Sequence, residues 1–400
     1  MDAHIRVHNV ELAKIGLGVS GGDVALLEMI RRLRTADLRH VLHTTASGHA
    51  TFTRHGLHPI PGKFEYHQVG SSNDERIGVS AAYAWRTAYA LRPPVVVPEP
   101  PSVVLSHSDI WPTVIYAHRL ARRNNLPWIA WSHMVLPDLT RGYRGQFTGR
   151  RTVPSYAFAL SAMTQRLSLR LMAKKASRVL TINHYTKKEL VRRGITEDLI
   201  TIIPYGADHL ARPETGNCTP RPFTAVFVGR FHEQKGIMDL PDIWVHVRKQ
   251  IPDARLAIVG DGPPAITTML RAALDRRGLR DAVKTLGFLE DGAKTQALRA
   301  SDLLVFPSYY ESWGIAALEA LRQGLPVVAY DLPVYEGLFN NGVLRVPIGS
   351  TEQFADAVVQ LARDPKHRRT LGRAGREAVS HFRWADSAQQ LSEEIHSVAK

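Results

Sequence analysis

Short apolar segments rich in valine, isoleucine and leucine alternate with amphipathic segments along the whole chain. The short segments have the length of β-strands, and the segments between them have helical periodicity. This alternation is typical of parallel sheets that carry helices on both faces. The pattern predicts a first sheet from strands over 5–12, 40–46, 65–70, 103–107, 128–132, 179–183 and 200–204, and a second from strands over 225–229, 255–260, 283–287, 303–307, 326–330 and 343–347.

The segment between the two predicted sheets, RPETGNCTPRP, has three prolines and no apolar periodicity, which indicates a linker. A length of 400 residues also fits two domains. We therefore predict an α/β protein with an N-terminal Rossmann-like domain over 1–207, a linker over 208–222, a C-terminal Rossmann-like domain over 223–378, and a helix over 379–400 that packs back toward the first domain.

A glycine-rich turn, KIGLGVSGGD, joins the first predicted strand to the first predicted helix. Its G-x-G-x-x-G spacing over residues 16–21 would let backbone amides approach a pyrophosphate. A dinucleotide site also needs an acidic residue at the end of the second strand, and the strand over 40–46 ends without one. An NAD-dependent oxidoreductase that uses this turn stays open as an alternative, beside a turn that meets another anion or packs helix on strand.

The charge of the chain favours anionic partners, because the formal net charge is +14 at pH 7. We do not expect nucleic acid as a partner, since the basic residues are spread along the chain and are not interleaved with aromatic residues on one surface. The single cysteine, Cys218, excludes an intrachain disulfide and a thiolate-rich metal cluster. We expect a cytoplasmic protein, with peripheral contact to the inner face of the membrane as an open alternative, because membrane-spanning and secretory patterns are absent from the sequence.

The segment SDLLVFPSYYESWGIAALEALRQGLPVVAYD carries the most specific chemical signal. It predicts a buried strand, a polar loop, and a helix between Gly314 and Gly324. Ligands of open parallel sheets bind beyond the carboxyl ends of strands, where this loop lies. Carboxylates beside a helix N-terminus would repel a pyrophosphate unless they accept hydrogen bonds from ligand hydroxyls. We interpret Glu311 as a ligand of the transferred sugar and Glu319 as a ligand of the ribose in a nucleotide sugar.

The segment FVGRFHEQKGI presents Arg230 and Lys235 in the turn after another strand of the same half. In this position the two cations can neutralise a leaving diphosphate as its bond breaks, which stabilises the transition state.

Together, FVGRFHEQKG, LAIVGDGP, LGFLEDG, SDLLVFPSYYESWGIAALEALRQGLPVVA and IIPYGAD resemble the retaining nucleotide-sugar glycosyltransferases of family 4, which have the GT-B architecture of two Rossmann-like domains facing across a cleft. The segment PPSVVLSHSDIWPTVIYAHRLARRNNLPWIAWSHMV resembles the acceptor-domain region that ends in an active-site histidine, here His133. The resemblance implies a retaining hexosyltransferase that moves a sugar from a nucleotide-diphosphate sugar to a hydroxyl of a glycan, glycolipid or small glycoside. A nucleotide-sugar epimerase with the GT-B fold stays open as a further alternative.

The resemblance also implies roles for individual residues. The catalytic set is His133, Arg230, Lys235 and Glu311, and the donor-binding set is Gly21, Gly22, Arg230, Lys235, Phe288, Glu311, Gly314, Ile315 and Glu319. The sequence has no Asp-x-Asp motif. We therefore expect no metal and no other cofactor, with the two cations and the N-terminus of the helix at Gly314 acting as the electrophile.

A basic loop, RGYRGQFTGRR over residues 141–151, follows His133. Its arginines have no carboxylates close in sequence, so we predict that the loop binds an anionic acceptor or an acidic membrane surface. These arginines are Arg141, Arg144, Arg150 and Arg151. A helix is predicted over 155–176, with a basic stripe of Arg166, Arg170 and Lys174. We expect its apolar stripe to be buried in the first domain; this stripe consists of Tyr156, Leu160, Met163, Leu167 and Leu171.

Overall fold

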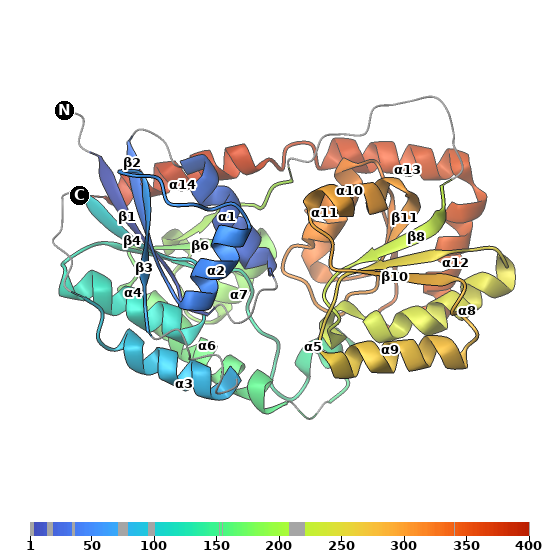
Figure 1. Cartoon of the computed structure of the whole chain (residues 1–400), viewed down its shortest axis with the longest axis horizontal. Coiled ribbons are helices and arrows are strands. Elements are labelled where there is room, and N and C mark those ends of the chain that lie inside the picture. Colours follow the sequence, from blue (N-terminus) through green and yellow to red (C-terminus); the bar gives the residue numbers. More distant parts are fainter. Residues whose placement is uncertain are drawn as a thin grey trace. The chain divides into compact units, whose positions relative to one another are not determined.

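The computed structural model describes residues 4–13, 19–33, 37–70, 79–94, 101–151, 153, 155–207, 221–339 and 341–399. The chain forms two compact units, each built around one parallel sheet (Figure 1). Unit 1 comprises Met1–Leu139, Pro154–Gly206 and Trp384–Lys400, and unit 2 comprises Thr140–Val153 and Ala207–Arg383.

The sheet of unit 1 has the strand order β3-β2-β1-β4-β5-β6-β7. Strand β1 pairs in parallel with both β2 and β4, so the strand order reverses between β1 and β4. Strand β4 is buried along its whole length because helices cover both faces of the sheet. The strands are β1 Ile5–Glu11, β2 Leu38–Thr44, β3 Phe64–Gln68, β4 Ser102–Ser106, β5 Trp128–Trp131, β6 Arg178–Thr181 and β7 Ile200–Ile202.

Two groups of helices cover the sheet of unit 1 (Figure 1). Helix α1 packs against α14, and α4 packs against both α3 and α6. The helices of this unit are α1 Gly21–Leu33, α2 Ala46–Arg54, α3 Val79–Ala90, α4 Trp111–Arg123, α6 Tyr156–Lys175, α7 His184–Arg192 and α14 Trp384–Val398, with a short 3-10 helix η2 at Glu197–Leu199.

The sheet of unit 2 has the order β10-β9-β8-β11-β12-β13, which reverses between β8 and β11. This is the strand order of a dinucleotide-binding Rossmann fold. Its strands are β8 Phe223–Val228, β9 Leu256–Val259, β10 Val283–Gly287, β11 Ser301–Phe306, β12 Val327–Tyr330 and β13 Val343–Val346. Its helices are α5 Gly142–Thr148, η3 Glu233–Lys235, η4 Ile237–Asp239, α8 Leu240–Gln250, α9 Pro264–Arg276, α10 Asp291–Arg299, α11 Ile315–Arg322, η5 Pro333–Tyr335, α12 Thr351–Arg363 and α13 Pro365–Ala378.

The predicted fold is confirmed, since a strand occurs at each position that the apolar pattern indicates, with ends within two residues of those expected. The unit boundaries differ from the predicted domains in one important respect. Residues 140–153, which we expected in the first domain, pack with unit 2. Most of the predicted linker, residues 208–220, lies outside the described residues, as do Gly16 and Gly18 of the first turn.

Helix α6 forms where it was predicted, but the expected burial of its apolar stripe is wrong for three of the five residues, while Leu160 and Leu171 are half-buried. Tyr156, Met163 and Leu167 are 73%, 58% and 46% exposed. The opposite face is buried instead, and it consists of Ala162, Gln165, Ser168, Leu169 and Met172. Gln165 explains this orientation, because its amide donates to Asp109 Oδ2 at 3.0 Å and to the Met134 carbonyl at 2.8 Å, which fixes that face toward the sheet.

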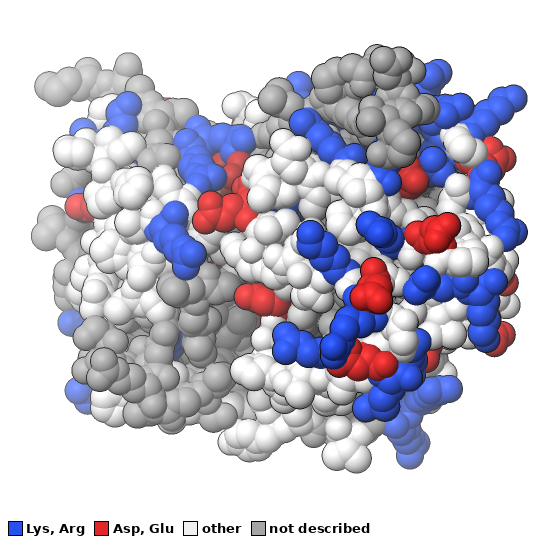
Figure 2. Space-filling view, turned by 45° about the vertical axis from the view of Figure 1, so that its right-hand side comes forward, with Lys and Arg blue, Asp and Glu red and all other residues white. Residues whose placement is uncertain are grey.

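Basic side chains also cover much of the surface of unit 2, with carboxylates among them (Figure 2). Several are engaged in ion pairs, such as Arg277 with Asp242 and Arg280 with Asp275, each at 2.7 Å. Within the described part of the chain, none of the helices combines the length and apolar character that a bilayer crossing needs.

Candidate active site

The candidate donor site of unit 2 lies at the carboxyl ends of β8 and β11, where the strand order of the sheet reverses. Ligands of open α/β sheets bind at such a point. The loop after β8 carries Arg230 and Lys235, and the loop after β11 carries Glu311. Lys235 Nζ lies 2.5 Å from Glu311 Oε1, and both side chains are largely buried. The structure therefore brings together two residues that the sequence placed 76 positions apart.

Three further contacts hold these two loops together. The side-chain amide of Gln234 donates to the backbone carbonyl of Tyr310 at 2.8 Å, and the backbone amide of Tyr309 donates to the backbone carbonyl of Gln234 at 2.8 Å. Gly236 has φ +64°, and a Cβ atom there would lie 1.9 Å from the Pro307 carbonyl oxygen. Only glycine permits this close approach of the two loops.

Helix α11 begins directly after the second loop. Gly314 precedes its first residue with φ +91°, a conformation that glycine adopts readily. Because glycine has no side chain, Gly314 cannot cap the helix, and the amides of a first turn without such a cap can bind an anion. Ile315, the first helical residue, is half-buried. Glu319 lies one turn further on and is only 5% exposed.

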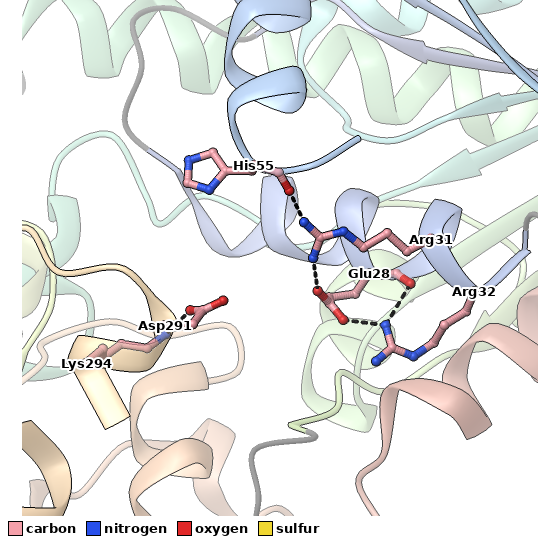
Figure 3. Close-up of polar contacts among 6 residues, drawn as sticks. All are labelled: Glu28, Arg31, Arg32, His55, Asp291 and Lys294. Atoms are coloured by element: carbon pink, nitrogen blue, oxygen red, sulfur yellow. Dashed lines mark hydrogen bonds and ion pairs between the residues drawn. The ribbon is translucent and has the colours of Figure 1, made fainter. Parts of the chain in front are cut away.

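Lys294 is a site residue that the sequence reasoning missed. Its Nζ lies 2.8 Å from Glu319 Oε1 and 3.0 Å from Asp291 Oδ1, and the Asp291 contact is drawn in Figure 3. Burial lowers the pKa of Lys294, but the carboxylates of Glu319 and Asp291 outweigh burial and raise this pKa above its ordinary value. Lys294 therefore stays charged. The sequence offered only a weak indication of this role for Lys294, because a lysine near the start of a helix usually faces solvent.

Two further predicted donor residues, Arg230 and Phe288, also follow the carboxyl ends of strands in unit 2, whereas Gly21 and Gly22 lie at the start of α1 in unit 1. Arg230 is exposed, and Phe288, directly after β10, is 47% exposed. His232 lies between Arg230 and Lys235 in sequence. Burial, together with these two cations, lowers the pKa of His232 to about 4, so its imidazole is neutral at pH 7.

Helix α5 corrects the prediction made for the basic loop. Residues 142–148 are helical, and Arg144 has a carboxylate partner that is distant in sequence. Arg144 Nη2 lies 2.7 Å from Asp239 Oδ1 and also donates to the Tyr309 hydroxyl at 2.7 Å. The hydroxyls of Tyr309 and Tyr330 donate to Asp239 Oδ2 at 2.7 Å each. Arg144 thus belongs to a polar network inside unit 2, while Arg141, Arg150 and Arg151 are exposed.

Aromatic contacts place α5 beside the donor-site loops. The Tyr143 ring lies 5.5 Å from His232 and 5.9 Å from Tyr310 between centroids, and Phe147 stacks on Tyr310 at 5.7 Å. His232 belongs to the loop of Arg230 and Lys235, and Tyr310 directly precedes Glu311. The segment that we expected to contact an acceptor therefore packs on the two loops that carry the predicted donor residues.

In unit 1, His133 follows β5 and lies beside the N-terminus of α1. A Cβ atom on Gly22 would lie 3.3 Å from His133 Cδ2, so a glycine at this position lets the helix start approach the imidazole. Gly21 and Gly22, the first residues of α1, thus share one site with His133. The sequence reasoning brought these three residues together only through the family resemblance.

Both ring nitrogens of His133 have protein partners. Nε2 is 2.6 Å from the His107 carbonyl, which can only accept, so Nε2 carries the hydrogen. The Tyr205 hydroxyl donates to Nδ1 at 2.6 Å. Burial lowers the pKa of His133 to about 4, although the His107 carbonyl and the Asp23 carboxylate oppose this. His133 is therefore a neutral, fixed ring, and proton transfer by it would first require one of these bonds to break.

Two residues near His133 were not predicted. Tyr205 lies in the segment IIPYGAD, which was recognised without a role for its tyrosine. Asp109 accepts from the Ser132 hydroxyl at 2.6 Å, directly before His133. Burial raises the pKa of Asp109 to about 6. These contacts hold the segment after β5 in place.

Two family models match the chain. The family described as "Glycosyl transferase 4-like domain" matches residues 20–206, and the family described as "Glycosyl transferases group 1" matches residues 215–378. Apart from residues 140–153, which belong to unit 2, the first match falls on unit 1, and the second falls on unit 2.

Among relatives, the phosphatidyl-myo-inositol mannosyltransferase of Mycobacterium leprae is 34% identical over 213 residues, which are 52% of this chain and 53% of that protein. The chain thus spans about half the length of this relative. Among solved structures, Anabaena HepE in complex with UDP and glucose has a TM-score of 0.72 at 18% identity, covering 98% of this chain and 100% of that one. Sucrose-phosphate synthase from Thermosynechococcus elongatus has a TM-score of 0.73 at 20% identity, covering 98% of each chain. These similarities show the fold.

Proposed function

The chain belongs to the family 4 glycosyltransferases of GT-B fold, and from this premise we propose that it transfers a sugar from a nucleotide-diphosphate sugar to a hydroxyl acceptor. The observation that carries the proposal is the pairing of Lys235 with Glu311 and of Lys294 with Glu319 around the N-terminus of α11. This arrangement offers cations and backbone amides to a diphosphate, and carboxylates to hydroxyls on either side of it.

The diphosphate is bound by Arg230, by Lys235 and by the first amides of α11. An ammonium group has three hydrogens. Lys235 therefore retains donors for phosphate oxygens while one hydrogen is directed at Glu311. Because negative charge on the leaving diphosphate increases in the transition state, these contacts lower the barrier more than they strengthen ground-state binding.

The two carboxylates bind hydroxyl groups. Glu311 accepts from the transferred sugar and Glu319 from the ribose. The lysines also reduce repulsion between these carboxylates and the diphosphate. Phe288 and Ile315 complete the nucleotide-binding surface.

The reaction proceeds with retention of anomeric configuration. The bond between the anomeric carbon and the diphosphate oxygen breaks, and the acceptor oxygen bonds to that carbon on the same face. The acceptor proton passes to the departing phosphate oxygen. Neutral His133 orients a substrate without exchanging its own proton. No metal is required, since Arg230 and Lys235 supply the positive charge, and we expect EDTA to leave the rate unchanged.

The names of similar proteins suggest a hexose donor. HepE was solved with UDP and glucose, and the mycobacterial relative is a mannosyltransferase acting on a phosphatidylinositol. The acceptor is a glycan, a glycolipid or a small glycoside. The enzyme works on the cytoplasmic side of the membrane. An NAD-dependent oxidoreductase and a nucleotide-sugar epimerase are the competing functions, which the following experiment separates from transfer.

Binding of UDP-, GDP-, ADP- and TDP-sugars and of NADH is measured by calorimetry, followed by product analysis with a hydroxyl acceptor. We expect micromolar binding of one nucleotide sugar and a glycoside product with the donor's anomeric configuration. Glu311→Gln and Glu319→Gln lose a charge-assisted acceptor worth roughly 1.5–3 kcal/mol, so each lowers turnover about tenfold or more. Exposed Glu336→Gln is the matched control. NADH binding without nucleotide-sugar binding, an epimerised donor as the only product, or wild-type rates in both site variants would each overturn the proposal.

A further inference from the structure

Helix α6 presents one exposed stripe that is apolar at its start and basic toward its end. Tyr156, Met163, Leu167, Arg170 and Lys174 follow at intervals of seven, four, three and four residues, which places them on one side of a helix. All five are exposed, and the apolar members are exposed by 46–73%. The stripe is therefore a continuous surface opposite the face that packs on the sheet.

Helix α3 lies beside α6 and has an exposed tryptophan of its own. The Tyr83 hydroxyl of α3 donates to Thr164 Oγ1 of α6 at 2.8 Å, so the two helices lie side by side (Figure 1). Trp85 of α3 is 48% exposed. Tryptophan and tyrosine rings with an apolar body and a polar edge are favoured at the boundary between water and lipid.

The charge of the two helices has a single sign. The sequences of α3 and α6, VSAAYAWRTAYA and YAFALSAMTQRLSLRLMAKK, contain no aspartate or glutamate. On α6, Arg166, Arg170, Lys174 and Lys175 are exposed. This differs from the surface of unit 2, where basic side chains lie among carboxylates (Figure 2).

We propose that the exposed stripe of α6 docks unit 1 on an anionic lipid bilayer. An interfacial helix inserts apolar side chains at headgroup level while its cations meet anionic lipids. The stripe provides both features. A second copy of the chain is a poorer occupant, because a contact between two such stripes would bring together the cations of both copies with no carboxylate of α6 to pair with them. In the basic loop, one of the four arginines, Arg144, is paired with Asp239.

The proposal is tested with the full chain and vesicles of phosphatidylcholine, with or without phosphatidylglycerol, by co-sedimentation. We expect binding to the anionic vesicles that weakens with added salt. The triple variant Arg166→Gln, Arg170→Gln, Lys174→Gln reduces the partition coefficient by about a hundredfold, at about fivefold for each basic residue. The double variant Met163→Ser, Leu167→Ser reduces it at least tenfold at every salt concentration, because it removes the inserted groups.

Two matched controls separate this surface from the general positive charge of the chain. The first control is a triple variant that removes three exposed cations from α13: Lys366→Gln, Arg369→Gln, Arg373→Gln. The second control is Met269→Ser, which removes a methionine of α9 that is 57% exposed. Both controls retain wild-type binding if the proposal is correct. Circular dichroism and thermal melts verify that every variant is folded.

Three results would overturn the proposal. The first is that the wild-type chain fails to bind anionic vesicles. The second is that the α13 variant loses as much binding as the α6 variant that lacks three basic residues. The third is that the α6 variant Met163→Ser, Leu167→Ser binds normally. A dimer in light scattering that becomes monomeric in the Met163→Ser, Leu167→Ser variant would identify the stripe as a contact between copies and would equally exclude the membrane. None of these readouts uses transferase activity, so they are independent of the proposed reaction.

Discussion

Lys294 Nζ lies 2.8 Å from Glu319 Oε1, and Lys235 Nζ lies 2.5 Å from Glu311 Oε1. Each carboxylate of the candidate donor site thus has its own lysine, contributed by a different loop or helix. Glutamates buried this deeply would lower the stability of the folded state if they had no such partners. The lysines place a positive charge beside each carboxylate, close to a helix N-terminus that is suited to an anion.

Replacing Lys294 with Met should weaken donor binding. Glu319 and Asp291 would lose the cation between them, and their negative charge would repel the diphosphate. We expect the donor Kd to rise at least tenfold by calorimetry, while Lys294→Arg retains most of the affinity. Lys284→Met, which removes an exposed lysine from β10, should bind like the wild type. Unchanged affinity of Lys294→Met would show that Lys294 has only a structural role.

Replacing Arg230 or Lys235 with Ala should lower kcat more than it raises the donor KM. The reason is that the charge on the leaving group is greater in the transition state than in the bound substrate. Steady-state kinetics with varied donor measures both constants. Arg248→Ala, a variant of α8 outside the candidate site, is the control. An increase in KM with unchanged kcat would mean that these cations bind donor and transition state equally.

Replacing Arg144 with Met should destabilise unit 2. Asp239, whose side chain is 7% exposed, would keep the Tyr309 and Tyr330 hydroxyls but lose its cation. Hydrogen bonds to charged groups contribute about 1.5–3 kcal/mol, and we expect a loss near the lower end because Arg144 is 40% exposed. Denaturant unfolding measures this loss. Arg150→Met, in the same segment but exposed, should unfold like the wild type.

Unit 1 should lose stability as the pH falls below about 6.5. Burial lowers the pKa of His8 and His133 to about 4 and that of His107 to about 3, so the folded state resists protonation that the unfolded chain accepts. Their stabilising effect is complete above the unfolded pKa and is lost through the range from about 6.5 to about 4.

Each of these histidines contributes a slope of about 1.4 kcal/mol per pH unit within that range. Urea unfolding at pH 7, 6, 5 and 4.5 measures the total slope, which His107→Gln should reduce by one such contribution. A free energy of unfolding that stays constant between pH 7 and pH 4.5 would contradict the assignment.

The strands were predictable because a buried parallel strand is apolar along its length, as VVL in β4 illustrates. The partners of single side chains were not. The sequence did not reveal that Arg144 reaches Asp239, which lies 95 residues away. The buried face of α6 was predicted from its apolar residues, but Gln165 and its polar partners determine the orientation of that helix. Hydrophobic periodicity identifies a helix and its two faces, whereas a buried polar network can decide which face turns inward.

The discontinuous composition of unit 1 has a consequence for the order in which the protein is made. The chain leaves unit 1 after residue 206 and returns only at Trp384, so α14 is synthesised after all of unit 2. Because α14 packs on α1, unit 1 lacks one of its layers while the ribosome completes the later unit. During that interval the surface of α1 that α14 will cover is exposed to solvent and to chaperones. The first unit to emerge from the ribosome is therefore the last to finish folding.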